Sequence, residues 1–198
     1  MFDKISNYMT DMIYSTLPNI APERREVIEY GVYMTVSELV KITLILLISI
    51  LLGIVHYVMA VVVVYGIQRT FLGGIHAKTH LGCMVTHSAI VFGVSAAAIH
   101  LRIDSMYLML AVVPFSYVTA YLYAHADLPQ KPVKSKKQRK QLRVGGFILL
   151  TLLFAASWFL PGTWSRIILF TCFIQALFMT PIAYKISKNK YGREEVLV

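Results

Sequence analysis

The residues best suited to chemistry lie in one stretch, RTFLGGIHAKTHLGC, residues 69–83. It holds an arginine, two adjacent glycines, two histidines and a cysteine, and long apolar runs flank it on both sides. A cysteine thiolate attacks carbonyl carbon well when a histidine takes its proton or a helix N-terminus stabilises its charge. The pattern therefore indicates that Cys83 is a nucleophile, and we expect it where the next helix begins.

Three histidines are candidates for the base that activates this thiol: His76, His80 and His87. The second and third lie within about one helical turn of Cys83, whereas His76 is about 10 Å away along an unbroken helix. The glycines at positions 73, 74 and 82 would allow the chain to bend and bring His76 closer. Spacing alone leaves the choice open.

A metal site is a competing interpretation of the same side chains. His76, His80, Cys83 and His87 follow one another at steps of four, three and four, which is typical of one helix face. A helix rises about 16 Å from the first to the last, so these four side chains do not converge on one ion. Position 77 is Ala, where a zinc-protease helix H-E-x-x-H has its Glu. A third interpretation is a polar collar at a membrane boundary. We expect neither a metal nor another cofactor.

The elements that position this stretch are membrane helices. Of the 198 residues, 57% are hydrophobic and 15% are charged, and the mean hydropathy is +0.64, which excludes an ordinary soluble domain. Five runs without Asp, Glu, Lys or Arg are at or near the roughly 20 residues that a helix needs to cross hydrocarbon. These runs are residues 42–68, 79–101, 105–126, 144–165 and 167–184. We predict an all-α, multi-pass membrane protein with a single domain over residues 1–198 and no nucleic-acid partner.

The run 42–68 is long enough for one tilted span or for a hairpin that turns near Gly53. The hairpin gives about six spans, near residues 31–52, 57–71, 84–101, 106–125, 144–161 and 166–184. Sixteen of the 19 Lys and Arg residues then lie on one side together with both termini and residues 69–83. The positive-inside rule makes that side cytoplasmic in a bacterial cell membrane. A single long span would move only the N-terminus outside.

Two segments outside the spans carry further expectations. Within residues 1–30, apolar side chains between Phe2 and Ile13 recur at helical spacing, which predicts an amphipathic helix at the lipid interface. A partly buried surface helix fits the same pattern. Residues 127–143 hold seven basic residues and one acidic residue, and we expect a cytoplasmic loop there. Such a loop attracts either anionic lipid or an acidic peptide.

Ionisable residues within the spans are costly in hydrocarbon and therefore suggest a role. Glu38 and Lys41 are three positions apart, so we expect them to pair, and we keep Glu38 as a candidate substrate-binding residue. A transporter, an alternative function for this chain, would place ionisable residues in the middle of its spans, and the last four spans contain almost none.

The pattern R-x-x-x-G-G-x-H-A, with a Cys seven residues after the His, resembles the signature of the accessory gene regulator B (AgrB) family of membrane cysteine endopeptidases. These enzymes process the propeptide of a bacterial quorum-sensing signal. The run YAHADLPQKPVK, residues 123–134, is similar to the family's Y-A-P-A-D run, with His125 in place of Pro. Size and six-span hydropathy agree over nearly the whole chain. The resemblance implies that His76 is the general base and Cys83 the nucleophile, and that Arg69, Gly73 and Gly74 shape the site.

The resemblance also implies the substrate and the product. The substrate would be a propeptide with an amphipathic helix, a core containing a Cys or Ser, and an acidic C-terminal tail. Cys83 would cleave between core and tail and hold the core as a thioester, which the side chain of the core attacks to close a cyclic thiolactone or lactone. A homodimer in the lipid bilayer is a further implication.

Four other expectations concern the groups around the thiol. We expect backbone N–H groups near Gly73 and Gly74 to bind the oxyanion. Arg69 is expected to pair with the acidic tail or with a structural carboxylate. Asp127 is a candidate third member of a triad that orients His76. The acidic tail is expected to meet four lysines of the basic segment: Lys131, Lys134, Lys136 and Lys137.

Overall fold

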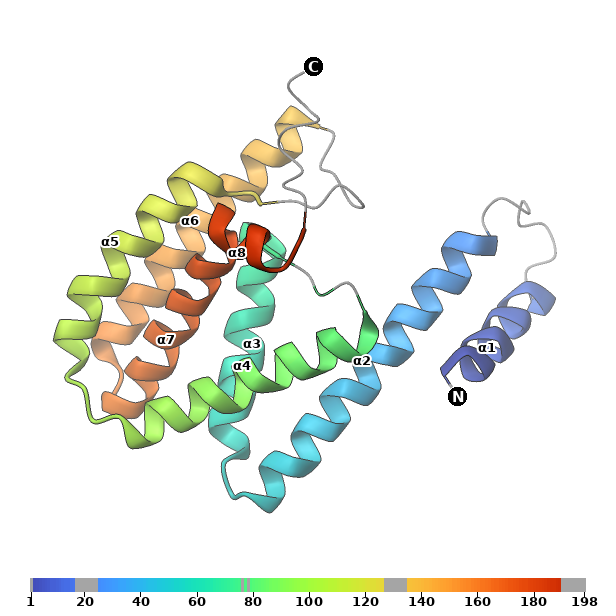
Figure 1. The fold of residues 1–198 in the computed structure, drawn as a ribbon, viewed down its shortest axis with the longest axis horizontal. Coiled ribbons are helices and arrows are strands. Elements are labelled where there is room, and N and C mark those ends of the chain that lie inside the picture. The colour runs from blue at the N-terminus through green and yellow to red at the C-terminus, as the bar shows by residue number, and fades with distance from the viewer. Residues whose placement is uncertain (1, 17–24, 76, 78, 127–134, 190–198) are drawn as a thin grey trace. The chain divides into compact units, whose positions relative to one another are not determined.

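A computed structural model describes residues 2–16, 25–75, 77, 79–126 and 135–189, and these ranges are helical apart from short connections (Figure 1). The predicted all-α class is confirmed. The chain divides into two compact units, Met1–Gly53 and Ile54–Val198, and each is described by itself.

The first unit consists of α1, Phe2–Thr16, and α2, Arg25–Leu51, which pack against each other. The structure thus contains a helix where an N-terminal amphipathic helix was expected, and its place at a lipid interface remains a prediction. Within α2, the Lys41 Nζ lies 2.6 Å from Glu38 Oε1 and 2.5 Å from Glu38 Oε2. The expected pairing is confirmed, and it gives Glu38 a structural partner on its own helix.

The apolar run 42–68 is divided between two helices. The first, α2, ends at Leu51, and α3 spans Val55–Leu72. Gly53 lies between them with a φ of +69°, a left-handed conformation that favours glycine. Within the described ranges, six helices are long and apolar enough to cross a membrane, as the hairpin interpretation predicted.

In the second unit, α7, Gly162–Met179, is the central helix. It packs against five others: α3, α4 (His80–His100), α5 (Ser105–Tyr123), α6 (Lys136–Phe159) and α8 (Pro181–Ile186). Half of its apolar window is buried, a larger share than in any of the other candidate spans of the described chain. Leu169, Cys172 and Ala176 belong to the core cluster, together with Leu72 at the end of α3. Side chains on α7 are therefore fixed by contacts with several neighbouring helices.

Glycines allow α6 to approach the end of α3 closely. A Cβ atom on Gly145 would lie 2.7 Å from the Phe71 ring, and one on Gly146 would lie 2.5 Å from Leu72 Cδ2. A larger residue at either position would require the Phe71 or Leu72 side chain to move. The close approach packs α6 at these glycines on the C-terminal end of α3, and the basic residues of α6 precede them.

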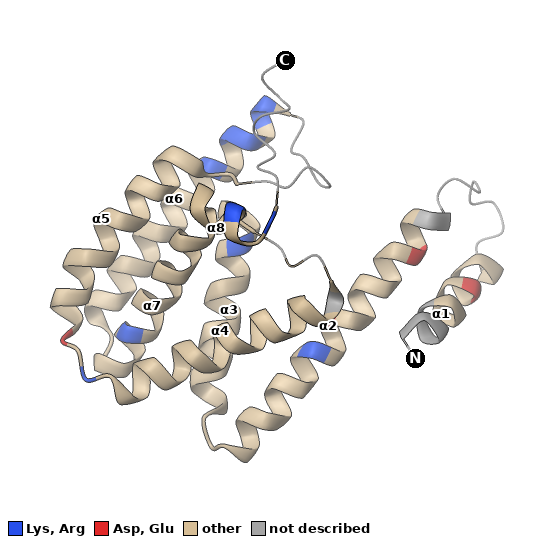
Figure 2. Cartoon of the chain, viewed as in Figure 1, with Lys and Arg blue, Asp and Glu red and all other residues tan. Residues whose placement is uncertain are grey.

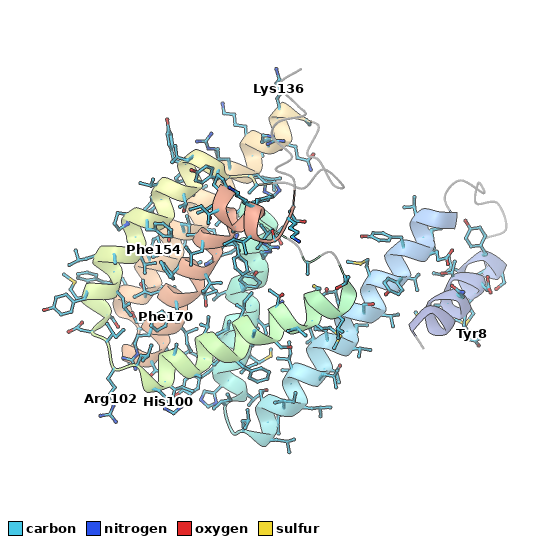
Figure 3. The ribbon with its side chains drawn as sticks, viewed as in Figure 1. Tyr8, His100, Arg102, Lys136, Phe154 and Phe170 are labelled. Atoms are coloured by element: carbon cyan, nitrogen blue, oxygen red, sulfur yellow. The ribbon has the colours of Figure 1, made fainter. Side chains whose placement is uncertain are left out.

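The structure differs from expectation at two helix ends. Ser135 caps α6, its Oγ accepting from Gln138 N, so residues 136–143 of the expected basic loop are helical. The sixth span ends at Met179, because Pro181 cannot supply the N–H that would continue α7 and instead begins α8. The basic side chains of this unit gather at the start of α6 and around α8 (Figure 2). Figure 3 places Lys136 at that end and His100 and Arg102 at the other.

Candidate functional site: a thiol at a helix start and a hydrogen-bonded glycine turn

Cys83 lies in the first turn of α4. Thr79 precedes the helix in an extended conformation, and its Oγ1 accepts a hydrogen bond of 3.1 Å from Gly82 N. The Cys83 amide donates to the Thr79 carbonyl at 2.9 Å. The side chain is half-buried and forms no disulfide. A helix N-terminus favours a negative charge nearby, so this position suits a thiolate.

The residues that follow α3 form a tight turn, Gly73–Ile75, which we call the glycine turn. Gly73 has a φ of +74° and Gly74 a φ of +121°. The Gly74 amide donates to Ala126 O at 2.7 Å, and the Ile75 amide donates to Phe178 O at 3.1 Å. The segment after α5 and the end of α7 therefore both hold the turn.

The expectation that the glycine amides bind the oxyanion is contradicted by these bonds. Gly73 N donates to Arg69 O at 3.1 Å, and Gly74 N is engaged with Ala126 O. An amide that already donates within the fold is not available to a developing negative charge. The two glycines serve the geometry of the turn instead.

Two side chains converge on the carbonyl oxygen of Gly73. Arg69 Nη1 donates to it at 3.1 Å and Gln175 Nε2 at 2.7 Å. Arg69 Nη2 also donates to the Ile75 carbonyl. Among the described residues, the hydrogen bonds of Arg69 thus go to backbone carbonyls and not to a structural carboxylate, and pairing with an acidic tail stays a prediction. Its guanidinium closes the glycine turn onto the end of α3.

The glycine turn also requires residues without side chains. A Cβ atom on Gly73 would overlap the Ala126 carbonyl, and one on Gly74 would overlap the Arg69 guanidinium and lie 3.0 Å from Phe178 O. Both positions have positive φ, which L-residues with a Cβ rarely adopt. Space and backbone conformation therefore both select glycine here.

Tyr65 links α3 to the start of α4. Its buried ring meets the His87 ring edge-on at a centroid distance of 5.7 Å, and the Arg69 Cζ atom lies 5.7 Å from the ring centroid. The tyrosine thereby connects the arginine of the glycine turn with the helix that carries the thiol.

The segment after α5 resembles a family motif and contacts the end of α3. Ala126 N donates to Leu72 O at 3.0 Å, and Gly73 and Ala126 form an isolated parallel bridge. The His125 Nδ1 atom lies 2.9 Å from Phe71 O. His125 and Ala126 therefore bind the end of α3 through hydrogen bonds to its backbone.

The remaining candidate residues fall into three groups. His76, Asp127, Lys131 and Lys134 lie outside the described residues. Lys136 and Lys137 are exposed in the first turn of α6. Glu38 belongs to the other unit. The structure thus places Arg69, Gly73 and Gly74 in one cluster, and the partner expected to activate Cys83 stays a prediction.

Sequence analysis did not identify Gln175 or Tyr65. Both lie in apolar runs, and a fully buried amide in such a run is costly unless it is hydrogen-bonded. Gln175 could have been identified on that ground, since it is the glutamine of the uncharged run 167–184. The aromatic ring carried no such signal, because tyrosines are numerous in this chain.

Comparison with known proteins gives a consistent result. The family model described as Accessory gene regulator B matches residues 6–179. An AgrB-like protein of Clostridium perfringens is 25% identical over 158 residues, covering 77% of this chain and 73% of its own length. An AgrB-like protein of Listeria welshimeri is 24% identical over 170 residues, covering 85% and 82%. No solved structure matches the chain.

Proposed function

The chain belongs to the accessory gene regulator B family, and from this membership and the surroundings of Cys83 we propose that it is a membrane-embedded cysteine endopeptidase. Membership indicates a role in the agr quorum-sensing system. The substrate we propose is a signal propeptide with a C-terminal acidic tail, cleaved at the junction of signal core and tail. Cys83 in the first turn of α4, where a helix N-terminus favours a thiolate, is the observation that carries the proposal.

The first step is acyl transfer to sulfur. The Cys83 thiolate attacks the carbonyl carbon at the junction, with His76 holding the proton that the thiol gave up. The tetrahedral intermediate collapses with cleavage of the C–N bond, and His76 returns the proton to the departing amine of the tail. The products of this step are the released tail and the core held as a thioester on Cys83.

The second step releases a ring. A cysteine thiol within the core attacks the thioester carbonyl, a thiolactone forms, and the Cys83 sulfur leaves as a thiolate that is reprotonated. One thioester replaces another, so the exchange is nearly balanced in energy. Water competes with the core for the thioester, so a half-buried sulfur between helices favours cyclisation over hydrolysis.

We propose that the acidic tail of the propeptide binds to the basic residues at the start of α6. Lys136 and Lys137 are exposed at the start of α6, between two and three helical turns before the glycines at which α6 contacts the end of α3. We place this end of the unit at the cytoplasmic face on the positive-inside rule. Lys131 and Lys134 would extend the same basic surface, and Asp127 would orient His76.

Cleavage by purified protein in lipid vesicles tests the proposal directly. A propeptide substrate is incubated with wild type, Cys83→Ala, His76→Ala and Cys172→Ala. Cys172 is buried in the core and is the matched control, because it is the other cysteine of the chain. We expect cleavage in wild type and Cys172→Ala, and loss of at least about a thousandfold in the other two.

The intermediate can be observed as well. Denatured wild type should carry added mass equal to the acylated core, removable by hydroxylamine, and Cys83→Ala should not. Cleavage that persists in Cys83→Ala would refute the thiol mechanism. If that residual activity were abolished by a chelator, a metal mechanism would take its place.

A further inference from the structure

Gln175 is a buried amide in the middle of an apolar helix. Its side chain is 0% exposed, and its Nε2 donates to Gly73 O at 2.7 Å, a bond between residues 102 positions apart. Its Oε1 has no hydrogen-bond partner among the described residues. Burying an amide with one atom unsatisfied is unfavourable. A leucine would fill this place at lower cost, so the amide needs a reason beyond packing.

The bond from Gln175 completes the attachment of the glycine turn to α7. Ile75 N donates to Phe178 O, less than one helical turn further along α7. Arg69 holds the same Gly73 carbonyl from the side of α3, and Ala126 holds the Gly74 amide from the side of α5. The turn is thus held by α3, by α7 and by the segment after α5, and Cys83 follows Ile75 eight positions further along the chain.

We propose that Gln175 is a positioning residue for the thiol site. Its amide ties the Gly73 carbonyl to α7 and fixes the place at which the chain leaves α3 toward position 76. The proposal rests on the proposed function where it concerns peptide cleavage, while the tie itself is a property of the fold. Gln175 does not touch the reacting atoms in this scheme and acts through the glycine turn.

Gln68 provides a matched control within the same bundle. It is also 0% exposed, but its Nε2 lies 3.0 Å from Cys172 Sγ, and its Oε1 likewise has no partner among the described residues. Gln68→Leu therefore removes an equally buried amide without touching the glycine turn. A difference between the two leucine variants reports the tie to Gly73 and not the loss of a polar core residue.

The experiment compares wild type, Gln175→Leu and Gln68→Leu in lipid vesicles by three measurements. Hydrogen exchange by mass spectrometry follows peptides that cover residues 70–77, whose amides at 74 and 75 are hydrogen-bonded in the fold. The rate of alkylation of Cys83 by iodoacetamide follows the thiol without any peptide substrate. Steady-state cleavage of the propeptide gives kcat and KM separately.

For Gln175→Leu we expect faster exchange over residues 70–77, slower alkylation of Cys83, and a kcat lowered by about tenfold with KM within about threefold of wild type. For Gln68→Leu we expect all three within about twofold of wild type. Equal effects of the two variants, or unchanged exchange and alkylation in Gln175→Leu, would overturn the proposal. Should Cys83→Ala still cleave, the proposed function fails, and exchange and alkylation then decide the positioning role alone.

Discussion

At the scale of the residue, Gly73 is where three parts of the bundle meet. Its amide closes α3, its carbonyl accepts from Arg69 and Gln175, and its Cα faces the Ala126 carbonyl without room for a Cβ. Each contact alone is a modest hydrogen bond, worth about 1 kcal/mol. Together they hold the turn in one conformation. The proposed base, His76, follows Gly73 by three positions, so we expect its place to depend on this turn.

Replacing Gly73 by Ala should release this turn. The added Cβ would overlap Ala126, and the backbone conformation of Gly73, with a φ of +74° and a ψ of −146°, costs an L-residue roughly 1–3 kcal/mol by itself. We expect a loss of stability of about 2 kcal/mol and a loss of cleavage larger than the loss of folded protein. Thermal unfolding in detergent and cleavage per folded molecule measure the two effects.

Gly66→Ala is the control for that variant. Gly66 is in α3, about two turns before Gly73, and no other atom lies within 4 Å of the place that a Cβ would take. Alanine there should therefore be neutral or slightly stabilising. Equal activity of Gly73→Ala and Gly66→Ala would show that the turn does not govern the thiol site.

Residue types indicated the chemistry but not the hydrogen-bond partners. The start of α4 at His80 agrees with the expectation that Cys83 lies at a helix start, because Thr79 is a strong capping residue. The expected role of the glycine amides was wrong, because the Gly74 and Ile75 amides find their acceptors on Ala126 and Phe178, which are distant in sequence. Local spacing contains no information on which distant carbonyl accepts a hydrogen bond from a given amide.

At the scale of the element, the first turn of α4 carries the proposed nucleophile, Cys83. The helix cap is Thr79, whose Oγ1 accepts from Gly82 N, and Cys83 lies in the positively polarised first turn. The expected spans were right in number because four uncharged runs have the length that one crossing requires and the longest, 42–68, was divided near Gly53. Their ends were less well predicted: the basic residues 136–143 continue α6, since Lys and Arg are good helix formers outside hydrocarbon.

Removing the cap of α4 should weaken catalysis more than stability. Thr79→Ala deletes the oxygen that accepts from Gly82 N and costs about 1 kcal/mol of helix stability. Fraying of that turn displaces Cys83, so we expect cleavage to fall several-fold and Thr79→Ser to restore it. Initial rates on the propeptide measure this directly.

The cap of α5 supplies the comparison. Asp104 Oδ1 accepts from Met106 N at 2.8 Å at the opposite end of the unit, so Asp104→Ala should cost similar stability and leave cleavage unchanged. If both cap variants lose the same activity, the first turn of α4 has no special part in the reaction.

At the scale of the molecule, several helix ends of the larger unit meet in one place. The end of α3, the segment after α5 and the end of α7 hold the glycine turn, and α6 packs on the last residues of α3 through Gly145 and Gly146. The same end carries the basic start of α6, whereas Arg102 lies at the other end, as Figure 3 shows, and Arg166 donates there to Ala98 O. A concentration of positive charge at this end of the unit suits a peptide whose leaving portion is acidic, because the charges attract it before any specific contact forms.

This charge distribution predicts that KM depends on salt only for a propeptide whose tail is acidic. Exposed charges are screened over about 10 Å at 0.1 M salt and about 3 Å at 1 M. KM for a propeptide with an acidic tail should therefore rise with salt, and KM for one whose tail carries amides in place of carboxylates should change little.

Replacing Lys136 and Lys137 by Gln should flatten the salt dependence for the acidic tail, because those side chains are exposed at the start of α6. Arg102→Gln, at the other end of the unit, should leave it intact (Figure 3). Parallel salt dependence for both propeptides would assign the basic residues to anionic lipid instead of the substrate.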